Sequence, residues 1–96
     1  MSDAFDAGRK AGFEADGEID AFGISSFVDE YRVGYVIGFT QSEHAGTPAP
    51  HWSVFAGENA AKARVPMQKF REHFDRESWS SFTEGYENEL NADQDD

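Results

Sequence analysis

The sequence predicts a mainly α-helical protein in which four or five short helices pack as two helical hairpins. Apolar side chains recur at the spacing of a helix face between residues 27 and 39 and again between residues 79 and 90, and a pair of short glycine-containing motifs occurs twice. The 96 residues are enough for one small domain. We therefore expect one compact domain over residues 1–90, followed by a disordered acidic tail over residues 91–96.

The first expected helix lies near the N-terminus and carries small side chains along one face. Ser2 or Asp3 is a suitable N-cap, because a side-chain oxygen there accepts a hydrogen bond from the first backbone N–H groups of a helix. The stripe consists of Ala4, Ala7, Ala11 and Ala15, and it lies beside Phe5, Gly8 and Gly12. Small residues allow a second helix to approach closely.

The strongest helical pattern lies in the middle of the chain. Six residues share one face at helical spacing: Phe27, Tyr31, Gly34, Tyr35, Gly38 and Phe39. Ser26, followed by Asp29 three residues later, is a suitable N-cap. The competing interpretation is an α+β fold with a β-hairpin at residues 35–55, because residues 35–40 are rich in β-forming side chains. We favour the helix, because strict alternation is absent and both glycines fall on the helical stripe.

The second half predicts three further helical stretches after a linker at residues 44–50. One runs from residue 57 to residue 64 and ends before Pro66, and the next covers residues 67–74. The last is amphipathic, with Asp75 or Ser78 as its N-cap. Its apolar face consists of Trp79, Phe82, Tyr86 and Leu90.

The two halves of the chain read as copies of one unit, residues 4–43 and 53–90. The motif at residues 8–12 is repeated 49 residues later at 57–61, and the Tyr31-x-x-Gly34-Tyr35 motif is repeated 51 residues later at 82–86. The alternative to a true repeat is that the two motifs resemble each other by chance, since Gly and Ala are common residues. A repeat predicts two helical hairpins that pack together and bury aromatic side chains. The residues expected in that core are Tyr31, Phe39, Trp79, Phe82 and Tyr86.

Residues 5–38 resemble the ribosome modulation factor family. The family pattern is a Gly-x-x-Ala-Gly helix, then a turn of the Asn-Pro-Tyr type, then a helix with Trp-x-x-Gly-Trp. In this chain residues 8–12 match the first helix motif, and residues 25–27 stand where the turn is expected. Tyr31-x-x-Gly34-Tyr35 takes the place of the second helix motif. The resemblance implies a helical hairpin. The family is basic and associates with ribosomes, whereas this chain is acidic and lacks the Pro and both Trp at those places, so the resemblance speaks to fold more than to ribosome binding.

The charge of the chain is strongly negative and unevenly distributed. Acidic residues outnumber basic residues 19 to 8, for a formal net charge of −11. Residues 1–30 hold eight acids and two bases, residues 72–96 hold nine acids and one base, and residues 44–71 hold one acid and four bases. Such a field repels phosphate and attracts basic protein surfaces. We therefore expect a basic protein as the partner rather than a nucleic acid.

Metal and thiol chemistry find no support in the sequence. The absence of cysteine excludes disulfides, thiolate zinc sites and a cysteine nucleophile. Asp16, Glu18 and Asp20 alternate as in a calcium loop, but the sixth and twelfth positions, Ala21 and Phe27, are not the Gly and Glu that such a loop requires. We interpret this segment as an acidic turn.

Catalytic and membrane motifs are also missing. His44, His51 and His73 have no partner at metal-ligand spacing, and Ser80 and Ser81 lie in an amphipathic helix without a nucleophile motif. No glycine-rich phosphate loop or long apolar run occurs, and the first residues lack the basic-then-apolar order of a secretion signal. We expect a cytoplasmic protein that is not an enzyme, has no cofactor and does not bind membranes.

The function expected from these observations is that of a small acidic inhibitor. Carboxylates along helices of a rigid scaffold can imitate the phosphates of a nucleic acid and occupy the channel of a nucleic-acid-handling protein such as a CRISPR or restriction effector. In size and charge the chain is similar to phage-encoded inhibitors of that class, which would act in the host cytoplasm. The expected partner-binding carboxylates form two groups: Asp16, Glu18, Asp20, Asp29 and Glu30 in one, and Glu84, Glu87 and Glu89 in the other.

Two alternatives stay open at this point. One is a ribosome-associated regulator that uses the basic middle of the chain, at Lys62, Arg64, Lys69 and Arg71. The other is a module that forms a homodimer through exposed aromatic side chains.

Trp52 follows two prolines and is either a partner anchor or part of the core.

Overall fold

The computed structural model describes residues 3–15, 21–47 and 49–94, and its regular elements are all helices within these ranges. They are α1 (Asp3–Glu14), α2 (Ala21–Ile24), α3 (Asp29–Glu43), α4 (Ala49–Lys62), the 3-10 helix η1 (Met67–His73) and α5 (Arg76–Gln94). The prediction of a mainly α fold is therefore confirmed. Residues 35–43 belong to α3 and residues 49–55 to α4, so the alternative β-hairpin at residues 35–55 does not form.

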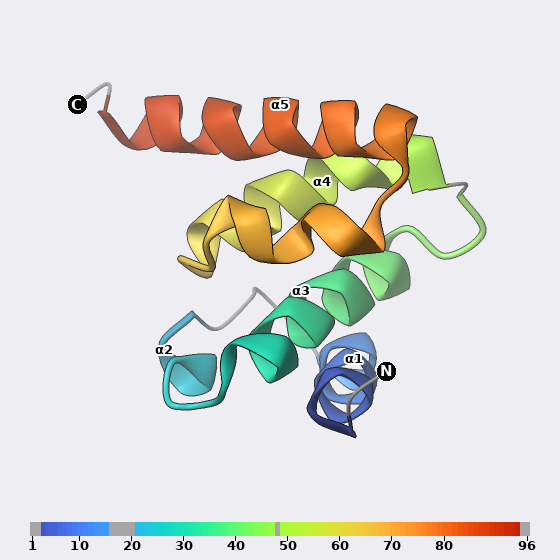
Figure 1. Ribbon diagram of the computed structural model, residues 1–96, viewed down its shortest axis with the longest axis vertical. Helices are drawn as coiled ribbons and strands as arrows, with labels where there is room; N and C mark the ends of the chain where they lie inside the picture. Colours follow the sequence, from blue (N-terminus) through green and yellow to red (C-terminus); the bar gives the residue numbers. More distant parts are fainter. Residues whose placement is uncertain (1–2, 16–20, 48, 95–96) are drawn as a thin grey trace.

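The elements stack in layers along the long axis of the molecule (Figure 1). α5 forms one edge, α4 and η1 lie beneath it, α3 crosses the middle, and α1 and α2 lie at the opposite edge. α1 packs against α3, and α4 packs against α5. These two pairs are the helical hairpins of the fold.

The hairpin of α1 and α3 is held at a backbone-to-backbone crossing that only glycine permits. A Cβ atom at Gly8 would overlap the carbonyl oxygen of Tyr31, and one at Gly38 would overlap that of Arg9. Gly12 and Gly34 lie equally close to backbone atoms of the opposite helix. The packed face of α1 thus consists of Phe5, Gly8 and Gly12 rather than of the expected alanine stripe. Ala7 is exposed, and Ala4, Ala11 and Ala15 are only partly buried.

The hairpin of α4 and α5 has a crossing of the same kind. A Cβ atom at Gly57 would overlap the carbonyl oxygen of Phe82, and one at Gly85 would overlap that of Val54. Gly57 follows Gly8 by 49 residues and Phe82 follows Tyr31 by 51, so the repeated motifs occupy equivalent places in the two crossings.

The hydrophobic core lies where α3, α4, α5 and η1 meet. Its largest fully buried aromatic side chains are Phe70 and Phe82, whose ring centroids are 4.8 Å apart. Phe39 is also buried, whereas Tyr31, Trp79 and Tyr86 are only partly buried. Trp52 is 9% exposed and meets Phe74 edge to face, which places it in the core. The hypothesis that Trp52 anchors a partner is therefore wrong.

Several helix ends differ from the sequence prediction. The N-cap of α3 is Val28 and no side chain caps this helix, so the expectation for Ser26 is wrong. α4 begins at Ala49, earlier than the predicted start at residue 57. Pro50 lies in its first turn, where a proline costs no helical hydrogen bond. This shortens the predicted linker at its end. α5 continues to Gln94, and no proline or glycine follows Gly85 to end it earlier. Residues 91–94 of the expected disordered tail are thus helical. Residues 95–96 lie outside the described part.

The N-terminus of α5 agrees with the prediction. The backbone N–H of Ser78 donates to Oδ1 of Asp75 at 2.8 Å, the geometry of an N-cap. This hydrogen bond holds the pKa of Asp75 below its ordinary value, because it favours the ionised carboxylate.

Candidate functional site

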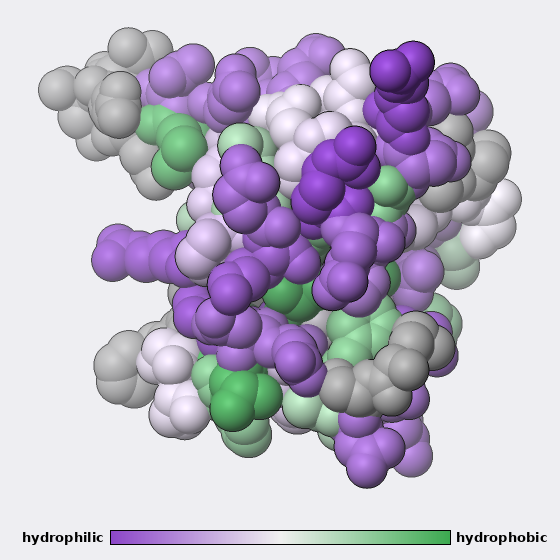
Figure 2. Space-filling view, in the orientation of Figure 1, coloured by the Kyte–Doolittle hydropathy of each residue, from purple (hydrophilic) through white to green (hydrophobic). Residues whose placement is uncertain are grey.

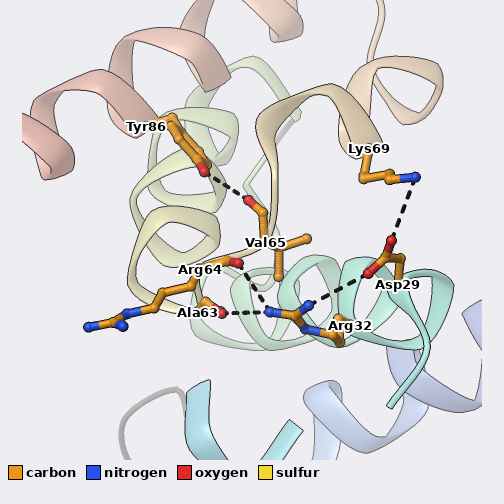
Figure 3. Close-up of polar contacts among 7 residues, drawn as sticks. All are labelled: Asp29, Arg32, Ala63, Arg64, Val65, Lys69 and Tyr86. Atoms are coloured by element: carbon orange, nitrogen blue, oxygen red, sulfur yellow. Dashed lines mark hydrogen bonds and ion pairs between the residues drawn. The ribbon is translucent and has the colours of Figure 1, made fainter. Parts of the chain in front are cut away.

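A polar joint built around Arg32 connects the two hairpins (Figure 3). Its Nη2 atom donates to the carbonyl oxygens of Ala63, at 3.2 Å, and Arg64, at 3.1 Å, where α4 ends. Ala63 and Arg64 follow the last residue of α4, and the guanidinium donates to a partly buried carbonyl at Ala63 and to an exposed one at Arg64. The Tyr86 hydroxyl from α5 donates to the next carbonyl along, that of Val65, at 2.9 Å.

Asp29, one of the expected partner-binding carboxylates, belongs to this joint. Its Oδ1 lies 3.6 Å from Nη1 of Arg32 and its Oδ2 lies 3.6 Å from Nζ of Lys69 in η1. Two cations therefore balance its charge, and it links α3 to η1. The structural role of Asp29 leaves less of its charge for a partner than the sequence suggested.

A shallow groove of about 810 Å³ opens beside this joint, between α1, α3 and η1. Apolar side chains from α1 and α3 form part of its wall, and carboxylates from α3 and η1 stand among them. The residues that line it are Phe5, Val28, Asp29, Glu30, Val33, Lys69, Glu72 and His73. Sequence reasoning found Asp29 and Glu30 but missed Val28 and Glu72, because only the packing of η1 against α1 and α3 brings them together.

The balance of charge in the groove is negative. Glu30 is exposed, and no ion pair joins it to a cation in the described part of the chain. Glu72 is 83% exposed at its side chain and lies 3.6 Å from Nε2 of His73. The ring of His73 stacks on Phe5 with centroids 4.5 Å apart, which holds η1 against α1.

The second expected group of carboxylates lies on α5, at the far edge of the molecule from the start of α3 (Figure 1). Glu84 and Glu87 are exposed and Glu89 is partly buried. Within residues 76–92 the one basic side chain is Arg76, and none of these three glutamates takes part in an ion pair with a described residue. α5 therefore presents uncompensated negative charge.

The expected binding carboxylates do not form one surface. Glu30 lies in the groove and the α5 glutamates lie on the opposite side of α4 and η1, so the structure keeps the two groups apart. Asp16, Glu18 and Asp20 lie outside the described residues. The acidic residues thus form at least two separate surfaces.

The basic residues of the middle segment are partly engaged within the fold. Lys69 pairs with Asp29, and the guanidinium of Arg71 lies 5.4 Å from the ring centroid of Trp79. Lys62 and Arg64 are exposed. Arg64 has a φ of 60°, the left-handed conformation that closes α4 and that favours glycine.

The histidines do not gather into a metal site. His44 stacks on Phe55 with centroids 4.3 Å apart, His51 is exposed, and His73 stacks on Phe5. Among the described residues, no group of three His, Asp or Glu side chains is placed to hold a metal ion. In that same part of the chain, no helix combines the length and the apolar character that crossing a membrane requires.

Comparisons with protein families, with curated proteins and with solved structures found no match to this chain.

Proposed function

We propose that the protein binds the basic surface of a nucleic-acid-handling protein and inhibits it by occupying the place of the nucleic acid. The single observation that supports this most is the uncompensated row of glutamates on α5. Glu84 and Glu87 are three residues apart on exposed helix, with no cation from the described part of the fold paired with either of them. Like charges so close repel each other, and a basic partner removes that cost.

The contrast with Asp29 supports a binding role rather than a general excess of acid. The fold pairs Asp29 with both Arg32 and Lys69, yet the sequence places no base along α5 after Arg76. Residues three apart lie on the same side of a helix, so Glu84 and Glu87 present their carboxylates together, and in this proposal they stand in for neighbouring phosphates. Association through such a row is fast and is weakened by salt.

A pull-down with matched charge variants tests this proposal. The wild-type protein serves as bait in nuclease-treated host lysate, and bound proteins are eluted with a salt gradient and identified by mass spectrometry. We expect a nuclease, restriction or CRISPR effector to elute at moderate salt, and E84Q/E87Q to lose most of it. D3N/D6N removes the same charge from exposed residues of α1 and serves as the control. Equal capture by both variants would contradict the proposal, as would the absence of any nucleic-acid-handling protein.

One observation favours the ribosome-associated alternative. Arg64 adopts a left-handed backbone conformation that glycine would adopt at lower cost, and its side chain points away from the joint (Figure 3). The fold therefore does not require an arginine there. Under this alternative R64G would fold normally and would co-sediment less with ribosomal particles than the wild type. Under the favoured proposal neither protein co-sediments.

A further inference from the structure

The groove between α1, α3 and η1 combines three features that a docking site for a protein segment needs. The first is apolar surface left open beside it. Val28 is 63% exposed and lines the groove, and the adjoining Phe27 is 47% exposed. Figure 2 shows an apolar patch over the junction between α2 and α3, on a face that is otherwise mostly polar.

The second feature is the uncapped start of α3. Val28 occupies the N-cap position with an extended backbone, and its side chain offers no acceptor to the N–H groups of the first turn. Those donors lie next to the apolar side chain of Val28 at the groove. A backbone carbonyl of a bound segment can accept from them.

The third feature is the sign of the charge. Asp29 is balanced by Arg32 and Lys69, which leaves Glu30 and Glu72 as the acidic side chains of the groove without a permanent cation beside them among the described residues. His73, which lies 3.6 Å from Glu72, adds positive charge only when it is protonated. The groove is thus complementary to Lys or Arg.

We propose that this groove binds a basic amphipathic segment of the partner protein. An apolar side chain of the segment packs on the exposed side chain of Val28, and its Lys or Arg side chains pair with Glu30 and Glu72. The proposal rests on the proposed function for the class of partner and adds a second contact to it: the groove holds one segment of the partner while the α5 carboxylates occupy its nucleic-acid site. Exposed apolar surface beside carboxylates is the reason, since buried apolar anchors carry most of the binding free energy of an interface, whereas charge mainly directs encounter and orientation.

A defined peptide tests the groove without knowledge of the natural partner. The probe is a synthetic peptide of about 14 residues with Leu on one helical face and Lys on the other, and the control is a permuted peptide of the same composition without an apolar face. Affinity is measured by isothermal titration calorimetry. Chemical-shift changes of backbone amides are expected at residues 28–33 and 69–73, with little change along α5.

Matched variants separate the groove from general charge. E30Q/E72Q and E84Q/E87Q remove the same charge, and we expect the groove pair to weaken binding at least about tenfold and the α5 pair less than about threefold. V28S gives α3 the side-chain cap it lacks, so it should raise the midpoint of chemical denaturation while weakening peptide binding. Weaker binding by a more stable protein cannot come from misfolding.

The outcomes distinguish this inference from the proposed function. Equal losses in the two charge pairs, unchanged binding by V28S, or equal affinity for the permuted peptide would each contradict groove recognition and would leave the proposal for α5 standing. If the pull-down captures no nucleic-acid-handling protein while the amphipathic peptide binds tightly in the groove, the proposed inhibition is contradicted instead.

Discussion

Gly38 of α3 lies directly against the backbone carbonyl of Arg9 in α1. No side chain fits between the two helices at this point, so G38A must push them apart or bend one of them. We expect a loss of about 3 kcal/mol in the free energy of unfolding, despite the higher helix propensity of alanine. Chemical denaturation followed by far-ultraviolet circular dichroism measures it.

Gly46 provides the matched control. It has a φ of 87°, and a Cβ atom added to it would meet no described atom within 4 Å. G46A therefore meets only the backbone cost of a left-handed residue, about 1 kcal/mol. An equal effect of the two substitutions would contradict the close crossing.

The joint at Arg32 predicts a large effect of its removal. R32M leaves the partly buried carbonyl of Ala63 without its donor and the exposed carbonyl of Arg64 to water, and we expect a loss of about 1–3 kcal/mol in the free energy of unfolding. R32K recovers only part of this, because one ammonium group does not reproduce the planar fork of the guanidinium. D29N, at a half-exposed carboxylate, should cost less than about 1 kcal/mol. A loss in R32M no greater than that in D29N would show that the joint does not connect the hairpins.

Tyr86 predicts a dependence of stability on alkaline pH. Burial raises the pKa of its hydroxyl above the ordinary value of 10.0, so the folded state favours the neutral form. The stability that this contributes is complete below the unfolded pKa and is lost as the pH rises through the folded pKa. Y86F removes the hydrogen bond to Val65, at a cost of about 1 kcal/mol near neutral pH. Denaturation curves on both sides of pH 10 should show that the wild type loses more stability than Y86F, and parallel losses would contradict a partly buried hydroxyl that the fold keeps neutral.

Asp75 predicts the opposite dependence, at acidic pH. Its pKa lies below 3.8 because the Ser78 N–H stabilises the carboxylate, so its contribution is present above that pH and is lost as the pH falls through the folded value. D75A should lower the denaturation midpoint at neutral pH. D75N keeps a capping oxygen without the charge, so it should be less harmful and should lose less stability on acidification than the wild type. Thermal melts at several pH values compare the three proteins.

The helices could be predicted from the sequence because their signals are local. The glycine-aromatic stripe of residues 31–39 and the apolar face of residues 79–90 have helical spacing, and the capping role of Asp75 follows from its place before the second of these. The start of α4 was missed because a proline-rich stretch looks like a linker, although a proline is harmless in the first turn. Val28 at the N-cap of α3 could not be inferred from the sequence, because N-cap positions prefer side chains that accept a hydrogen bond and valine has none.

The candidate site was less accessible to sequence reasoning, because it depends on packing. The exposed acids of α5 follow from the helical pattern alone, but the engagement of Asp29 requires Arg32 and Lys69 to be brought beside it by α3 and η1. No sequence pattern marks Glu72 as a site residue. It reaches the groove because the stacking of His73 on Phe5 packs η1 against α1.

Competition with nucleic acid tests the central proposal most directly. The protein is titrated into a complex of the captured partner and a fluorescently labelled duplex, and the anisotropy of the duplex is followed at two salt concentrations. We predict that the wild type releases the duplex, that E84Q/E87Q does so much less well, and that salt weakens the competition. A partner that holds protein and duplex together, so that the anisotropy does not fall, would contradict the mimicry of a nucleic acid.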